Sequence, residues 1–209
     1  MSITLPILYP ITDVSISGLS HAKQVELLAA AGATLIQLRD KEARPRDFYE
    51  AALKALDVGR ALGVTLVIND RVDLAVAVGA DGVHLGQDDL APSIARRLLG
   101  ESRIIGYSTH TMAQAVDADI EPVDYIAIGP VYETSTKIRP DPVVGLEALG
   151  RIKQRIHKPL VAIGGITLDR APEVLAAGAD SLAVISDVYS GEGVNSRVKA
   201  YFQLAEKPI

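Results

Sequence analysis

A short pattern recurs along this chain: a helix-ending glycine, then an apolar segment of strand length, then polar residues. Three clear copies are Gly32 with segment 34–38, Gly79 with segment 82–85 and Gly178 with segment 181–185. Glycine commonly ends helices because it adopts the left-handed backbone conformation at little cost. Strands that are apolar on both faces must be covered by helices on each side. The recurrence therefore predicts strands and helices that alternate around a parallel sheet.

The whole chain divides into eight such units. The expected strands are 7–11, 34–38, 64–68, 82–85, 104–107, 125–128, 159–163 and 181–185. The expected helices are 20–31, 45–62, 72–78, 92–99, 112–118, 146–156, 168–177 and 195–205. Eight units indicate an α/β fold of the (β/α)₈ TIM barrel type, as a single catalytic domain over 1–209. The alternative is a doubly wound open sheet, which usually has a glycine-rich turn where this chain has Thr12 to Ser15.

Composition narrows the classes of function. The net charge is −5 and the cations are scattered among acids, which argues against a nucleic-acid surface. The chain has no cysteine, so disulfides, thiolate catalysis and sulfur-ligated metals are excluded. No basic residue precedes Lys23 and no apolar run is long enough to span a bilayer, so neither a signal peptide nor a membrane span is expected. We expect a cytoplasmic protein with small-molecule substrates and no nucleic-acid or membrane partner. Assembly into a homo-oligomer is compatible with the sequence.

In a (β/α)₈ barrel the carboxyl ends of all strands meet at one face, so residues far apart in the sequence converge there. The polar residues and glycines at these ends combine cations, carboxylates, hydroxyls and backbone amides. They are Arg39, Lys41, Asn69, Asp70, Arg71, Gln87, Asp88, Asp89, Ser108, His110, Thr134, Thr136, Lys137, Gly164, Gly165 and Ser186, beside Ile185. This combination suits the binding of phosphates and a divalent metal ion.

Asp70 and Asp89 follow neighbouring strands and are candidate metal ligands. Mg²⁺ usually takes one or two carboxylates together with phosphate oxygens of the substrate. Acids at strand ends also cap the following helix, and Asp88 is an alternative ligand. Asp73 falls inside a helix pattern and is expected to be structural.

Three groups of residues are candidates for phosphate binding. Arg39 and Lys41 lie on one face of an extended segment, although such residues are often only surface charges. The segment 134–137 offers hydroxyls and a lysine in a long loop, which is typical of a lid over a phosphate. Gly164 and Gly165 expose backbone amides before a helix, or else form an ordinary tight turn.

Neither His84 nor His110 indicates a mechanism with a protein nucleophile. His84 alternates with apolar residues and is expected to be a core histidine or to support a site residue, whereas His110 lies at a strand end. No Ser-His-Asp or paired-glutamate arrangement is evident. The reaction therefore needs no strong protein nucleophile, and the substrates themselves would react.

Six separated motifs resemble those of the thiamine phosphate synthase family, and together they cover nearly the whole chain. They are Gln37-Leu-Arg-Asp-Lys41, Asn69-Asp-Arg-Val-Asp-Leu-Ala75, Ala80-Asp-Gly-Val-His-Leu-Gly-Gln-Asp-Asp89, Gly106-Tyr-Ser-Thr-His-Thr111, Gly129-Pro-Val-Tyr-Glu-Thr-Ser-Thr-Lys137 and Ala162-Ile-Gly-Gly-Ile166. The resemblance implies a (β/α)₈ transferase that joins 4-amino-2-methyl-5-(diphosphooxymethyl)pyrimidine to thiazole phosphate, with Mg²⁺ as cofactor. The products are thiamine phosphate and diphosphate.

The resemblance also implies a role for each matching residue. Asp70 and Asp89 would bind Mg²⁺, and Arg39, Lys41 and Lys137 would stabilise the departing diphosphate. The pyrimidine diphosphate would contact Gln37, Leu38, Arg39, Asp40, Lys41, Asn69, Ser108 and Lys137. The thiazole phosphate would contact Thr134, Ser135, Thr136, Gly165, Ile185 and Ser186.

Two segments depart from the family pattern. Asp187 places a carboxylate beside the expected thiazole-phosphate site, where it would oppose the phosphate if it faced inward. The segment 138–142 is proline-rich, which leaves the closure of the loop undetermined. Two other functions stay open: a thiazole tautomerase-like isomerase that relies on His110, and a non-catalytic protein that binds a phosphate ligand. Retention of the carboxylates and cations favours the synthase.

Overall fold

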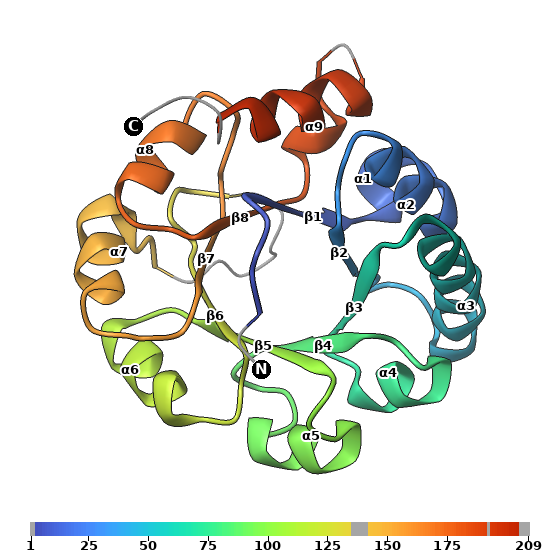
Figure 1. Cartoon of the computed structure of the whole chain (residues 1–209), viewed down its shortest axis with the longest axis horizontal. Helices are drawn as coiled ribbons and strands as arrows, with labels where there is room; N and C mark the ends of the chain where they lie inside the picture. Colours follow the sequence, from blue (N-terminus) through green and yellow to red (C-terminus); the bar gives the residue numbers. More distant parts are fainter. Residues whose placement is uncertain (1–2, 135–141, 192, 205–209) are drawn as a thin grey trace.

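The chain forms a closed parallel barrel (Figure 1). A computed structural model describes residues 3–134, 142–191 and 193–204. Each strand pairs in parallel with the next, and the last pairs with the first, which confirms the (β/α)₈ prediction. The strands are β1 (Leu8–Thr12), β2 (Leu35–Leu38), β3 (Thr65–Asn69), β4 (Gly82–Leu85), β5 (Ile104–Thr109), β6 (Tyr125–Ile128), β7 (Leu160–Ile163) and β8 (Ser181–Val184).

Helices surround the barrel on its outside (Figure 1). They are α1 (Val14–Ser17), α2 (His21–Ala30), α3 (Pro45–Leu62), α4 (Val72–Val78), α5 (Pro92–Leu99), α6 (Met112–Ile120), α7 (Gly145–Lys153), α8 (Ala171–Ala176), the 3₁₀ helix η1 (Asp187–Tyr189) and α9 (Val194–Gln203). The sequence pattern did not predict α1 or η1. Both are too short to show a helical repeat of apolar residues, and α1 depends on a local cap in which Asp13 accepts from the backbone N–H groups of Ser15 and Ile16.

Most element ends agree with the sequence to within a few residues. Gly63 ends α3 with a φ of 68°, as the helix-ending glycine predicts. The largest differences are at β5 and at the helices after β6 and β7. β5 continues to Thr109 because Ser108 and Thr109 pair with β6, while α7 ends earlier and α8 begins later than expected.

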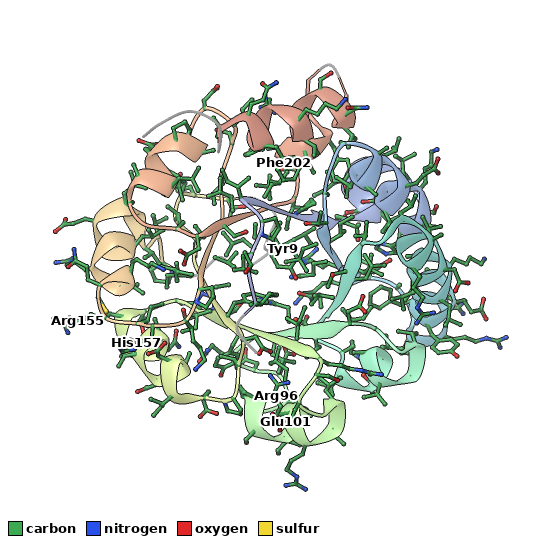
Figure 2. All side chains as sticks on the ribbon, in the orientation of Figure 1. Tyr9, Arg96, Glu101, Arg155, His157 and Phe202 are labelled. Carbon is green, nitrogen blue, oxygen red and sulfur yellow. The ribbon has the colours of Figure 1, made fainter. Side chains whose placement is uncertain are left out.

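The apolar side chains form two layers. One layer lies between the strands and the helices, and the other fills the barrel interior with Tyr9, Val67, Tyr125 and neighbouring residues. Figure 2 shows Tyr9 near the centre of the ring of strands. The segment before β1 crosses this ring in Figure 1, and its Leu5 packs against the interior layer. The barrel is therefore a filled core, and its strand ends are left to build a site.

None of the described helices is long and apolar enough to cross a membrane.

Candidate active site

Two carboxylates and a lysine lie together at the ends of β2, β3 and β4. The Nζ of Lys41 is 2.8 Å from Asp70 Oδ2. The side chain of Asp89 lies close enough to that of Asp70 for the two carboxyl groups to interact. Burial and the nearby charge of Asp70 raise the pKa of Asp89. A divalent cation bound between two neighbouring carboxylates would offset the repulsion between their charges.

The backbone holds both acids in place. Asp70 has a φ of 62°, and among the described residues no other non-glycine residue has a positive φ. Such a conformation is costly for a residue with a side chain and is often found at functional sites. Its N–H donates to the carbonyl of His84 at 2.7 Å, while Asp89 Oδ2 accepts from the N–H of Gly86 at 2.6 Å. The backbone of Asp70 and the carboxylate of Asp89 are thus both held by hydrogen bonds.

The donor set fits a hard divalent cation that is completed by a substrate. Searching the described residues finds no group of three or more His, Cys, Asp or Glu side chains able to hold a metal ion. Two carboxylates alone are typical of Mg²⁺ sites that share the ion with phosphate oxygens. Asp88, the alternative ligand, is exposed, whereas Asp89 is half-buried. The geometry favours Asp89 over Asp88.

Arg39 is held at the mouth of the barrel by one ion pair. Its Nη1 donates to Asp13 Oδ2 at 2.8 Å, and its backbone N–H donates to Thr12 Oγ1 at 3.3 Å. In the described part of the chain its other guanidinium N–H groups have no acceptor, which leaves them available to an anion. The sequence pattern did not assign Asp13 to the site. The available signal was an acid directly after a strand with serine two residues later.

Other residues near Arg39 at the strand ends have side chains that are engaged elsewhere. Asp40 accepts from the N–H groups of Glu42 and Ala43 and lies 3.4 Å from His21 Nε2, so it organises the loop after β2. The side chain of Leu38 belongs to the layer between strands and helices, and only its backbone can face a ligand. Arg71, another strand-end cation, is paired with Asp73 at the surface.

Beneath the charged residues, a row of buried polar side chains crosses the barrel. Gln37 Nε2 donates to Tyr9 Oη at 3.3 Å, and Tyr9 Oη is 3.0 Å from Tyr125 Oη. Tyr125 Oη is 2.9 Å from His84 Nδ1, and His84 Nε2 is 2.8 Å from Ser108 Oγ. His84 is thus a buried histidine that supports a predicted site residue, Ser108.

Burial also sets the charge state of this row. It lowers the pKa of His84 to about 4 and raises that of Tyr9 to about 12, so both are neutral near pH 7. Asn69 ends β3 and pairs with His84 in the neighbouring strand. Val67 faces the interior, and Asn69 lies two residues later in the same strand. Its side chain therefore points to the same side as this row.

At the ends of β7 and β8, the groups available to a ligand are backbone N–H groups. Gly164 and Gly165 have φ values of 99° and 63°, and a Cβ on Gly165 would lie 2.5 Å from the carbonyl oxygen of Glu133. Within the described ranges, no acceptor is found for the N–H groups of Gly165 and Ser186. Ile185 packs toward the barrel interior and Ser186 is exposed. The backbone N–H groups at these two strand ends are therefore available to an anion.

Asp187 turns away from this surface. Its carboxylate accepts from Arg197 at 2.9 and 2.7 Å, from Tyr201 Oη at 2.6 Å and from the N–H of Leu168 at 3.1 Å. Although burial acts to raise it, the hydrogen bonds from Arg197 and Tyr201 lower the pKa of Asp187 overall. The carboxylate is fully used in anchoring α9, so it does not oppose a phosphate at Gly165.

The loop after β6 is described in part. Thr134 is half-buried, whereas Ser135, Thr136 and Lys137 lie outside the described residues, as does most of the segment 138–142. His110, the histidine that a tautomerase would use, holds the start of this loop: its Nδ1 is 2.6 Å from the carbonyl oxygen of Gly129.

Comparison with known proteins agrees with this geometry. The profile of the TMP-TENI family, described as thiamine monophosphate synthase, matches residues 8–188. Thiamine-phosphate synthase of Chloroflexus aurantiacus is 42% identical over 193 residues, which is 92% of this chain and 89% of the relative. That of Koribacter versatilis is 47% identical over 194 residues, which is 88% and 89% of the two chains. This chain belongs to the thiamine monophosphate synthase family.

A solved structure of a thiamine monophosphate synthase family protein has the same fold. Thiamine phosphate pyrophosphorylase from Pyrococcus furiosus superposes with a TM-score of 0.85, 36% identity and 95% coverage of each chain. The resemblance seen in the separate motifs is thus confirmed, and the protein is an enzyme of the transferase class. The contacts described above place the charged residues and the glycines of this family member at one end of its barrel.

Proposed function

We propose that the enzyme joins 4-amino-2-methyl-5-(diphosphooxymethyl)pyrimidine to thiazole phosphate, giving thiamine phosphate and diphosphate. The observation that carries this proposal is that two different groups of residues suited to binding anions lie at one barrel end. Asp70, Asp89, Lys41 and Arg39 form the first, and the backbone around Gly165 and Ser186 forms the second. A reaction between a diphosphate and a monophosphate needs such a pair.

The charged site would stabilise the leaving group. The bond between the pyrimidine methylene carbon and the diphosphate oxygen breaks, and its electron pair leaves with the diphosphate. Arg39 and Lys41 would hold the charge that develops there, a task in which preorganised cations are most effective. Lys137, outside the described residues, would add a third cation. Asp70 and Asp89 would bind Mg²⁺, which when bound would neutralise diphosphate oxygens.

The second half of the reaction needs positioning more than acid–base catalysis. The thiazole nitrogen supplies the electron pair for the new carbon–nitrogen bond, so no protein base has to remove a proton. The amide of Gln37, with Asn69 and Ser108, would orient the pyrimidine, while Thr134, Ser135, Thr136, Gly165, Ile185 and Ser186 would hold the thiazole phosphate. Holding both reactants in line replaces a bimolecular encounter and can contribute a large part of the rate.

In the proposed function, residues 1–209 act as one catalytic domain on small molecules in the cytoplasm. Its test is diphosphate release by the purified protein with both substrates, with each alone, and with Mg²⁺ or excess EDTA. Mass spectrometry of the same mixtures identifies the organic product. We expect thiamine phosphate and diphosphate in equal amounts only when both substrates and Mg²⁺ are present. Binding of thiazole phosphate without product under any condition would contradict the proposal and would favour the isomerase or the non-catalytic binding protein.

A further inference from the structure

The buried polar row of the barrel interior is continuous and ends at two site residues. It joins Gln37, Tyr9, Tyr125, His84 and Ser108, which come from the five strands β2, β1, β6, β4 and β5. Its four contacts measure 3.3, 3.0, 2.9 and 2.8 Å. Side chains from five strands are needed to make it, so no local turn or helix cap explains it.

With the Gln37 side-chain nitrogen facing Tyr9, one direction of donation gives every hydroxyl proton inside the row an acceptor. The Gln37 amide donates to Tyr9, and Tyr125 Oη is the other hydrogen-bond partner of the Tyr9 hydroxyl among the described residues, so we assign the Tyr9 proton to that contact. The Tyr125 hydroxyl then donates to His84 Nδ1. In this arrangement His84 carries its proton on Nε2 and donates it to Ser108 Oγ. In the opposite direction Tyr9 would accept from both Gln37 and Tyr125, and its own proton would have no acceptor among the described residues.

The two ends of the row have opposite hydrogen-bonding capacities: one end can accept and the other can donate. Among the described residues, no donor contacts the side-chain oxygen of Gln37, and Ser108 Oγ has no partner other than His84. Gln37 therefore offers an acceptor to a ligand, while the Ser108 hydroxyl proton is left to be donated. Each bond in such a row polarises the next, so the ends are stronger than isolated groups.

The surrounding structure makes space for the centre of the row. A Cβ on Gly106 would lie 2.5 Å from His84 Nδ1 and closer still to the Tyr125 ring. The His84 and Tyr125 rings stack with centroids 5.6 Å apart, and Tyr9 meets Tyr125 edge-on at 5.9 Å. All three rings are at most 6% exposed. Glycine at position 106 is therefore required for the two rings to meet.

We propose that Tyr9, Tyr125 and His84 are positioning residues that fix the donor and acceptor ends of this row for the pyrimidine diphosphate. This inference rests on the proposed function. The Gln37 oxygen would accept from the exocyclic amine of the pyrimidine, and the Ser108 hydroxyl would donate to an anionic oxygen of the same substrate. The row thus couples recognition of the base to recognition of its phosphate, with no tyrosine touching the reacting atoms.

The protonated nitrogen of His84 gives a direct test that needs no turnover. In protein carrying ¹⁵N-labelled histidine, ring nitrogen spectra distinguish protonated Nε2 from protonated Nδ1, and the signal lost in His84→Gln assigns the residue. We expect Nε2–H in the wild type without substrate. Protonated Nδ1 would overturn the inference, even if the enzyme makes thiamine phosphate.

Kinetics test the positioning role. Removing either hydroxyl, in Tyr9→Phe or Tyr125→Phe, should raise KM for the pyrimidine diphosphate about fivefold, as loss of one hydrogen bond predicts. KM for thiazole phosphate should stay within about twofold, and the double variant should be no worse than the single ones, because one break already ends the row. Tyr201→Phe is the control, since it removes a buried tyrosine hydroxyl bonded to Asp187, outside the barrel interior.

Three kinetic results would overturn the inference: equal changes in both KM values, additive losses in the double variant, or the same change in Tyr201→Phe. If the wild type forms no product, the proposed function fails, while the histidine spectra still report on the row itself.

Discussion

The two sides of the barrel mouth differ in the groups that they present. The charged half, at β2 to β4, uses the side chains of Arg39, Lys41, Asp70 and Asp89, and these already bind one another or a neighbour. The glycine half, at β7 and β8, uses backbone held by packing, with Gly165 against Glu133. A ligand that binds Lys41 must replace its ion pair with Asp70, whereas the glycine half needs no such exchange.

This difference separates two ways of binding phosphate. Side-chain cations and carboxylates respond to a metal ion and to pH, and they suit a group whose charge changes during the reaction. Backbone amides carry fixed partial charges and suit a phosphate that stays unchanged. We therefore expect substitutions in the charged half to affect turnover and substitutions in the glycine half to affect binding.

The largest effect is expected for Asp89→Asn. The amide keeps an oxygen for the N–H of Gly86 but loses the charge that a divalent cation needs. Turnover should fall about 100-fold or more, as loss of a key electrostatic group predicts. Asp88→Asn, which changes an exposed neighbour, is the matched control and should stay near the wild type. Steady-state kinetics over a range of Mg²⁺ concentrations make the comparison, and equal losses in both variants would remove Asp89 from the metal site.

Gly165→Ala tests the glycine half. The added Cβ meets the Glu133 carbonyl at 2.5 Å, and the φ of 63° is strained for alanine. We expect KM for thiazole phosphate to rise about tenfold and turnover at saturation to change little, together with a loss of roughly 2 kcal/mol in unfolding free energy. Gly63→Ala is the control because it has a φ of 68° with no atom near the added carbon. If both variants leave KM unchanged, the glycine half does not bind the phosphate.

A pH titration should single out the buried histidine beneath the charged half. The pKa of His84 is about 4 in the folded chain, against 6.5 for an ordinary histidine. Between these pH values the unfolded chain binds more protons than the folded chain. The contribution of neutral His84 to the free energy of unfolding is therefore fully present above pH 6.5 and is lost as the pH falls. The expected loss is roughly 3 kcal/mol by pH 4, at about 1.4 kcal/mol per pKa unit. Denaturant titrations should show a shallower pH slope in His84→Gln than in the wild type, and equal slopes would contradict this prediction.

The smallest effect on activity is expected for Asp187→Asn. Its carboxylate is turned toward Arg197 and Tyr201, so KM for thiazole phosphate should stay within about twofold while the unfolding free energy falls by roughly 1–3 kcal/mol. Thermal unfolding and the two KM values measure these together. A marked fall in KM would show that Asp187 does repel the phosphate.

The sequence predicted the fold and the charged half because both depend on residue type and spacing. Helix-ending glycines such as Gly63 and Gly79 marked the units, and Asp70 and Asp89 followed neighbouring strands. The polar row was not predicted, since the contact of Tyr9 with Tyr125 joins residues 116 positions apart and depends on barrel closure. The orientation of Asp187 also required the structure, because Arg197 and Tyr201 come from a later helix.

The contrast between the two halves is tested most directly by calorimetric titration of inorganic diphosphate into the wild type and into the Asp70→Asn/Asp89→Asn variant. Each protein is measured with Mg²⁺ and with EDTA. We predict that Mg²⁺ tightens binding to the wild type at least about tenfold and has little effect on the variant. Equal affinity of the wild type with Mg²⁺ and with EDTA would contradict the account, because the charged half would then bind diphosphate without a metal ion.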